Sequence, residues 1–419
     1  MTTTAPTATR SFWTYWAATT TSNMGSAVTA IALPLTAVLV LDAGPFETGL
    51  LAAASYLAWI VIGLPAGAIV QRWPLRATQV VTDLVRAAAI LSVPLTWWAG
   101  HLTLAQLFLV ALTLNFAEVL FFSANTTFIT SVVPRDQLTG RNSLMSGTHA
   151  VTELGGPSLG GLVVQLAGAV PALLLDAVSY VVSAVLLRTL PERHQPGADD
   201  PTPVHRRIAE GWRFVTAHPV MAPCTWWACV VNTVCGAQHA LFAIYLVREL
   251  HAPAAVVGLL LATGGLGALL AAGATPWLVR RFGSARVVLL VGFFGFAGAL
   301  LLPAGTGHWG WAWFAVGNVL FAASVVPGSV VTRTYRQVAS PPELLSRVMG
   351  TVRFVSWGCI PLGGLLAGAV AEAAGARTVL LGSAFVLLAA PAILAASPVR
   401  RLRNLEDHNL VDHTTARQP

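Results

Sequence analysis

Long apolar stretches recur along the chain, separated by short segments rich in Arg, Pro and Gly. A helix that crosses the hydrocarbon core of a bilayer needs about 20 apolar residues. Unpaired backbone groups are not tolerated in lipid, so the pattern predicts an all-α polytopic membrane protein with twelve transmembrane helices. These are expected near residues 12–41, 46–70, 77–98, 103–128, 143–166, 171–190, 222–247, 255–279, 287–304, 310–332, 353–371 and 377–397.

Composition points the same way. The 419 residues are 55% hydrophobic and only 10% charged, which leaves too little polar surface for a water-soluble globule. All 24 basic residues are Arg, so the chain has no Walker A lysine, no Schiff-base lysine and no lysine nucleophile. The four Cys lie in apolar runs without metal-ligand spacing. We therefore expect no enzymatic activity, no metal and no cofactor, with any energy drawn from a proton gradient.

The net charge of +7 is distributed mainly over alternate connectors. Such a bias predicts the cytoplasmic side of a membrane protein, and with an even number of spans it places both termini in the cytoplasm. We interpret the charge as a topology signal in a bacterial inner membrane and expect no nucleic-acid partner. The expected partners are lipid and a small-molecule substrate, with the protein acting as a monomer.

The longest connector divides the chain into halves. Within it, VHRRIAEGWRFVTAH places apolar residues on one helical stripe and charged residues on the rest, which predicts an amphipathic helix on the inner leaflet. The expected organisation is a six-helix bundle (1–190), a cytoplasmic linker (191–220), a second six-helix bundle (221–398) and a cytoplasmic tail (399–419).

The halves also resemble each other in sequence. Trp16 and Gly25 match Trp227 and Gly236 at one offset, and the tract Pro134 to Gly161 returns as Pro341 to Gly364. Parallel duplication of six spans predicts two pseudo-symmetric bundles related by an axis along the membrane normal, with a substrate path between them.

Two motifs carry a family resemblance. GAIVQRWPLR, which begins at Gly67 and contains Arg72 and Arg76, resembles the gating-loop signature of the major facilitator superfamily, although Gln71 and Pro74 replace its usual Asp and Gly. GGPSLGG contains Gly156, Pro157, Gly160 and Gly161, matching the core of the signature of the family's antiporters. Stretches such as VVPRDQLTGRNSL resemble the actinobacterial-type drug, macrolide and siderophore exporters.

The resemblance implies twelve spans, alternating access and proton-coupled export of amphipathic small molecules. In that family, Gly67, Arg72 and Arg76 would gate the cytoplasmic side. Glycines four apart allow helices to touch along their backbones, and Pro157 bends its helix, so this segment is expected to act as a pivot. The alternative is ordinary packing of small residues. Asp83 is expected to neutralise Arg86 or to pair with the gating loop.

Ionisable residues inside membrane spans are costly and therefore functional candidates. Glu118 is the first proton-coupling candidate, because an uncharged Asn318 occupies its repeat position. The alternative is a carboxylate satisfied by hydroxyls or an Arg within its own bundle. His149 and Glu153 share a helix face and form a second candidate pair, or else only fix helix register. Asp176 is expected near the outer end of its span, held by water or a helix N-terminus.

Polar and aromatic residues within other spans are candidates for lining a cavity, or else for satisfied contacts inside a bundle. They are Asn23, Asn115, His239, Asn318 and Trp357. The function expected from all these features is secondary active transport, specifically proton-coupled export of an antibiotic, secondary metabolite or drug. A siderophore or nutrient carrier is the alternative within transport, and a non-transporting sensor or assembly protein is the alternative outside it.

Overall fold

The computed structural model describes residues 5–63, 66, 70, 73–133, 138–191 and 204–407. Within these ranges every regular element is a helix. The chain forms two compact units. Unit 1 comprises Met1–Asp200 and Ala252–Ala262, and unit 2 comprises Pro201–His251 and Thr263–Pro419. Each unit is described separately.

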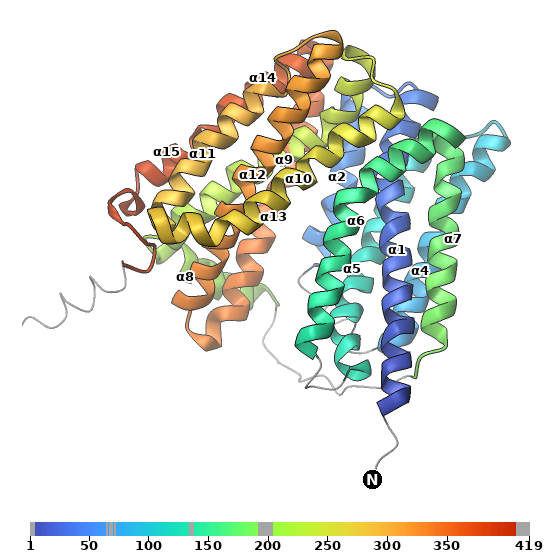
Figure 1. Ribbon diagram of the computed structural model, residues 1–419, viewed down its shortest axis with the longest axis horizontal. Coiled ribbons are helices and arrows are strands. Elements are labelled where there is room, and N and C mark those ends of the chain that lie inside the picture. Colours follow the sequence, from blue (N-terminus) through green and yellow to red (C-terminus); the bar gives the residue numbers. More distant parts are fainter. Residues whose placement is uncertain are drawn as a thin grey trace, which may run out of the picture. The chain divides into compact units, whose positions relative to one another are not determined.

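In unit 1, helix α1 packs against α7 and α6, while α4 packs against both α7 and α5. Helix α2 lies against α5, and α1, α6 and α7 can be followed side by side in Figure 1. The helices are α1 (Ala5–Val40), α2 (Pro45–Val61), α4 (Leu75–Trp98), α5 (Leu104–Val132), α6 (Leu138–Ala167) and α7 (Ala169–Arg188).

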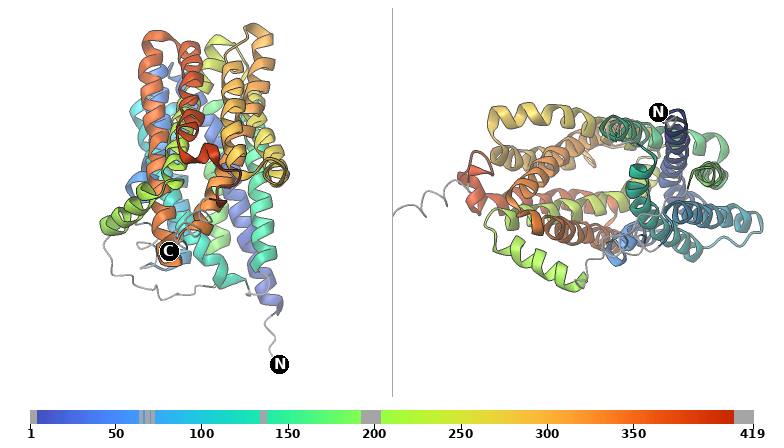
Figure 2. Two further views of the ribbon diagram at one scale, coloured as in Figure 1. Left: turned by 90° about the vertical axis from the view of Figure 1, so that its left-hand side faces the viewer. Right: turned by 90° about the horizontal axis from the view of Figure 1, so that it is seen from below.

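In unit 2, the most extensive helix contacts are those of α9 with α13 and of α11 with α12. Helix α8 lies beside α13, as the views in Figure 2 show. The helices are α8 (Val204–Ala217), α9 (Met221–Ile244) with a π-helical turn (Tyr245–Glu249), α10 (Ala254–Phe282), α11 (Ser284–Leu301), α12 (Gly307–Ala339), α13 (Pro342–Ala374), α14 (Ala376–Leu387), α15 (Ala389–Ala395) and a 3₁₀ turn (Pro398–Arg401).

Ten helical segments of the described chain are long and apolar enough to cross a membrane. Helices α2 and α6 occupy the two remaining stretches where spans were predicted. The predicted all-α fold with about twelve membrane helices is therefore confirmed.

Several helices extend beyond the apolar stretches that predicted them. A span was expected at 310–332, but α12 continues to Ala339, and α13 begins at Pro342 rather than near 353. The added turns carry Arg and Glu side chains. A helix accommodates these residues, but their low hydropathy excludes them from a membrane span predicted from the sequence. Gly168 and Gly375, with φ of 92° and 80°, separate α6 from α7 and α13 from α14. Both adopt a backbone conformation that favours glycine.

Glycines form close helix contacts in both units. In unit 1, a side chain at Gly156 would overlap Ala27 of α1, and one at Gly160 would lie 3.2 Å from the Cα of Val28. In unit 2, a side chain at Gly236 of α9 would overlap the carbonyl oxygen of Ile360 on α13. Small residues let helix backbones approach closely inside membranes.

Candidate functional site

An ion pair inside unit 1 joins α4 to α5. Arg86 Nη1 lies 3.0 Å from Glu118 Oε2. The Arg86 side chain is only 2% exposed, whereas that of Glu118 is 42% exposed. An arginine within the same bundle is the alternative partner that the sequence offers for Glu118, and this is the arrangement found. Glu118 is therefore the accessible end of a largely buried ion pair.

Asp83 lies near the same nitrogen of the guanidinium. Its Oδ1 is 3.7 Å from Arg86 Nη1, and its side chain is fully buried. Neither carboxyl oxygen of Asp83 makes a hydrogen bond with a described residue. The Arg86 guanidinium also lies over the rings of Phe121 and Tyr180, at 4.5 and 5.1 Å from their centroids. These aromatic faces hold the guanidinium in place through cation–π attraction.

A third carboxyl group, that of Asp176 on α7, lies within electrostatic range of Arg86. It is fully buried and accepts hydrogen bonds from the hydroxyls of Thr29 on α1 and Ser179 on α7. Asp176 is the eighth residue of α7, so the expectation that water or a helix N-terminus would hold it was wrong. Two hydroxyl groups hold it instead.

We call Asp83, Arg86, Glu118 and Asp176 the charge cluster. Tyr180 borders it and shares a hydrogen bond of 2.9 Å with Ser26 of α1. The cluster contains three carboxyl groups and one guanidinium on α4, α5 and α7, and α1 adjoins it through the hydroxyls of Ser26 and Thr29. Chemically, such an arrangement can accept and release protons.

The position of Asp176 in this cluster was not predicted from the sequence. The signal was nonetheless present: Asp176, Ser179, Tyr180 and Ser183 follow one another at helical spacing in an otherwise apolar span. Such a polar stripe indicates a helix face turned toward other protein rather than lipid.

Other ionisable candidates lie elsewhere in the structure. His149 is exposed on α6, and the side chain of Glu153 is outside the described residues. Gly67 and Arg72 also fall outside the described residues. Arg76 Nη1 donates a hydrogen bond of 2.7 Å to the carbonyl oxygen of Leu190. This bond ties the start of α4 to the segment that follows α7.

The cavity-lining candidates occupy varied environments. The Asn115 amide donates to the Ser55 carbonyl and joins α5 to α2. Asn318 is buried and donates to Thr263 Oγ1 over 3.2 Å, which joins α12 to α10. Asn23 is half-buried on α1, and His239 lies on the exposed side of α9. Trp357 is half-buried, with the Arg353 guanidinium 4.3 Å from the centroid of its ring.

The GPxxGG motif faces two different neighbours. Gly156 and Gly160 lie against α1, whereas a side chain at Gly161 would come within 2.8 Å of the Cα of Gly258 near the start of α10. The carbonyl oxygen of Pro157 also lies against Gly258. The motif is thus an area of backbone-to-backbone contact inside unit 1.

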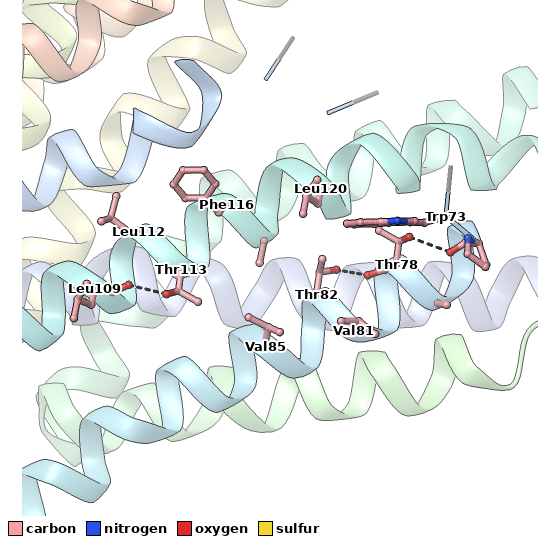
Figure 3. Close-up of a pocket in the computed structure, with 13 residues that line it drawn as sticks. Trp73, Thr78, Val81, Thr82, Val85, Leu109, Leu112, Thr113, Phe116 and Leu120 are labelled. Carbon is pink, nitrogen blue, oxygen red and sulfur yellow. Dashed lines mark hydrogen bonds between the residues drawn. The ribbon is translucent and has the colours of Figure 1, made fainter. Parts of the chain in front are cut away.

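A groove of about 680 Å³ lies between α4 and α5 (Figure 3). The hydroxyls of Thr78, Thr82 and Thr113 in its wall donate to carbonyls of their own helices, so the groove presents almost only hydrocarbon. Leu109 of this groove and Glu118 are two and a half helical turns apart on α5. The groove and the charge cluster therefore occupy opposite faces of that helix.

Solved structures share this fold. The nucleoside transporter NupG superposes with a TM-score of 0.76 at 12% identity, covering 92% of this chain and 98% of NupG. A bacterial homologue of the iron transporter ferroportin, in an inward-facing state, gives a TM-score of 0.70 at 17% identity, covering 92% of this chain and 98% of that one. The fold is that of the major facilitator superfamily of membrane transporters, to which the family model that matches this chain also belongs, and its members are transporters rather than enzymes.

Within that superfamily, the family model described as transmembrane secretion effector matches residues 1–418, and the chain belongs to this family. The multidrug efflux pump Tap of Mycolicibacterium fortuitum is 25% identical over 86% of this chain and 89% of its own. Tap of Mycobacterium tuberculosis H37Rv is 27% identical over 87% and 88%. The uncharacterized transporter YvqJ of Bacillus subtilis is 24% identical over 80% of each chain.

Proposed function

We propose that this multi-pass membrane transporter is a proton-coupled antiporter that exports a hydrophobic or amphipathic small molecule, such as an antibiotic, secondary metabolite or drug. The similarity to the multidrug efflux pump Tap supports export of such molecules. The charge cluster supports proton coupling, with Glu118 as the group that exchanges protons. We further propose a monomer in a bacterial inner membrane, with both termini in the cytoplasm.

The single observation behind the coupling proposal is the charge balance of the cluster. Three carboxylates around one guanidinium carry a net charge of −2, and Asp83, Arg86 and Asp176 are fully or almost fully buried. Burying an uncompensated charge costs several kcal/mol. Helix α5 contains no basic residue, and the one Arg of α7, Arg188, is its last residue, so neither helix supplies a second cation near the cluster. Binding of protons therefore lowers the electrostatic cost of burying these carboxylates. The cluster is neutral when two of its carboxyl groups carry protons.

Glu118 is suited to exchange because it is the exposed member. When it is ionised, it holds Arg86 from the side of α5. When it is protonated, the remaining anions near the guanidinium are Asp83 on α4 and Asp176 on α7. Proton binding at Glu118 thus weakens the attraction of Arg86 to α5 and leaves its attraction to Asp176 on α7. A ligand shifts a conformational equilibrium by its difference in affinity for the two states, and here the proton is that ligand.

The glycine contacts of α6 and the pair His149 and Glu153 have supporting roles in this proposal. The close contacts at Gly156, Gly160 and Gly161 give α6 a surface on which α1 and the start of α10 can pivot. His149 and Glu153 lie four residues apart on the same helix, about two turns and one turn before Gly156, so their protonation would alter the charge near that pivot.

The direct test uses purified protein in proteoliposomes with an imposed pH gradient. Uptake or release of hydrophobic fluorescent dyes and the accompanying proton movement are both measured. Wild-type protein should move dye against its gradient with counter-movement of protons. Glu118→Gln should lose gradient-driven transport but retain facilitated equilibration of the dye, whereas Glu118→Asp should retain part of the coupling.

Glu406→Gln is the matched control, because this exposed residue lies outside the membrane helices. It should behave as wild type. Normal stoichiometry of protons and dye in Glu118→Gln would refute the coupling assignment. Lack of transport of any dye by wild-type protein would refute the export of hydrophobic compounds.

A further inference from the structure

Three arginines gather near one end of unit 2, and the proposed function makes no use of them. Arg333 and Arg336 lie on α12, and Arg353 lies on α13. Arg333 is within electrostatic range of both other guanidinium groups. We call these three residues the arginine cluster.

Acidic residues are scarce on the helices around this cluster. Helices α9, α10, α11 and α12 contain no Asp or Glu, Glu372 lies near the far end of α13, and the side chain of Glu343, near the start of α13, is outside the described residues. By contrast, the membrane helices of unit 1 carry the three carboxyl groups of the charge cluster. The described membrane helices of unit 2 therefore carry an excess of arginine over acidic residues.

Arg336 is the decisive residue of the cluster, because it is about nine-tenths buried. Its Nη2 donates to Thr332 Oγ1 over 3.1 Å, but its buried Nε has no hydrogen-bond partner among the described residues. A buried donor without an acceptor is unfavourable, and more so when it is charged. Arg336 is thus short of a hydrogen-bond acceptor.

The end of α12 accounts for only part of this requirement. Arg336 stands in its last turn, where the helix dipole presents a partial negative charge of about half an electron. That charge is small beside three guanidinium groups. The guanidinium fork matches the geometry of carboxylate and phosphate oxygens. In addition, Trp357 next to Arg353 provides an aromatic face beside the charges.

The geometry points to an oxyanion-binding site at Arg333, Arg336 and Arg353, which receives the carboxylate or phosphate group of an amphipathic ligand. Arg336 donates to the oxyanion from its buried Nε, Arg333 adds charge, and Trp357 packs against the apolar part of the ligand. Two sources have this chemistry: the transported molecule itself and the headgroup of an anionic phospholipid. The site depends on neither the direction nor the energy source of transport.

The test measures thermal unfolding of the full-length protein in phosphatidylcholine nanodiscs. In the first arm, 2-naphthoate is titrated against 2-naphthalenemethanol, which has the same ring system without the charge. In the second arm, phosphatidylglycerol is added to the bilayer and naphthoate is omitted. Each arm is run on wild type, Arg336→Gln, Arg333→Gln and, as the matched control, Arg286→Gln, an exposed arginine on α11.

An anion should raise the unfolding midpoint of wild type and of Arg286→Gln, while the neutral alcohol should not. Arg336→Gln and Arg333→Gln should weaken this effect by about tenfold in apparent affinity, or about 1.4 kcal/mol. Because Arg333 is exposed, its variant tests the site without disturbing buried packing. An effect of naphthoate alone assigns the site to the transported molecule, and an effect of phosphatidylglycerol assigns it to lipid. No stabilisation in either arm, or equal losses in Arg286→Gln, would overturn the inference.

Discussion

Gly25 of α1 lies directly against the carboxyl group of Asp176 on α7. A side chain at Gly25 would overlap both Asp176 Oδ1 and Ser179 Oγ. The absence of a side chain at this one position lets α1 bring Thr29 within hydrogen-bonding distance of Asp176. Gly25 therefore shapes the buried end of the charge cluster although it carries no chemistry itself.

Gly25→Ala should destabilise the protein by about 1–3 kcal/mol, the usual cost of adding atoms to a packed site. The thermal unfolding midpoint in detergent measures it. Gly382→Ala is the control, because a side chain there meets nothing within 4 Å and alanine is favoured over glycine in a helix by about 1 kcal/mol. Equal midpoints for the two variants would contradict the tight contact.

Arg86→Gln should be strongly destabilising, by about 3–5 kcal/mol, because it leaves buried carboxylates without a cation. Adding Glu118→Gln should restore part of the loss, since it removes one of the anions that Arg86 had balanced. Unfolding midpoints of both single variants and the double variant form a thermodynamic cycle. Simple additivity would show that the two side chains do not interact.

Gly211→Val should release α8 from α13, because a side chain at Gly211 would meet the carbonyl oxygen of Arg347 at 2.6 Å. Hydrogen exchange of the α8 backbone amides should accelerate. Glu210 forms an ion pair with Arg347 at the same contact, but both side chains are partly exposed, so Glu210→Gln should cost less than about 1 kcal/mol. Unchanged exchange in Gly211→Val would show that backbone contact does not hold α8.

Cys229 of α9 and Cys359 of α13 have thiols within hydrogen-bonding reach of each other. Copper(II) phenanthroline should oxidise them to a disulfide, with two Cu(II) complexes each accepting one electron and the thiols losing two protons. Maleimide labelling of the unfolded protein should then fall from four thiols to two. Cys229→Ser should abolish this loss, and retention of all four thiols in oxidised wild type would contradict the contact.

Hydropathy was sufficient to predict the membrane helices, because lipid leaves a spanning segment few options besides an apolar helix. It was insufficient at their ends. The polar turns of α12 and α13 beyond the apolar core and the π-helical turn at Tyr245–Glu249 carry no distinct signal of hydrophobicity. Their conformation follows from hydrogen bonding and packing rather than from contact with lipid.

The charge cluster could be predicted only in part. Glu118 stood out as an acid in an apolar run, and Asp83 and Arg86 stood out as neighbours on one helix. Their meeting could not be predicted, because it depends on how α4 and α5 are rotated about their axes. In a helix that is apolar on most sides, the faces toward lipid and toward protein look alike. Asp176 was misjudged for the same reason.

The contact between α9 and α13 also has a mechanical consequence. A Cβ added at Gly236 would overlap the Ile360 carbonyl oxygen and would lie 3.1 Å from the Gly364 nitrogen. A Cβ added at Gly363 would overlap the Thr233 carbonyl oxygen. Interlocking side chains would have to change rotamer whenever one helix slid along the other. Backbone-to-backbone contact contains no such interlocking side chains, so a small axial shift between these two helices only replaces one contacting peptide group by the next.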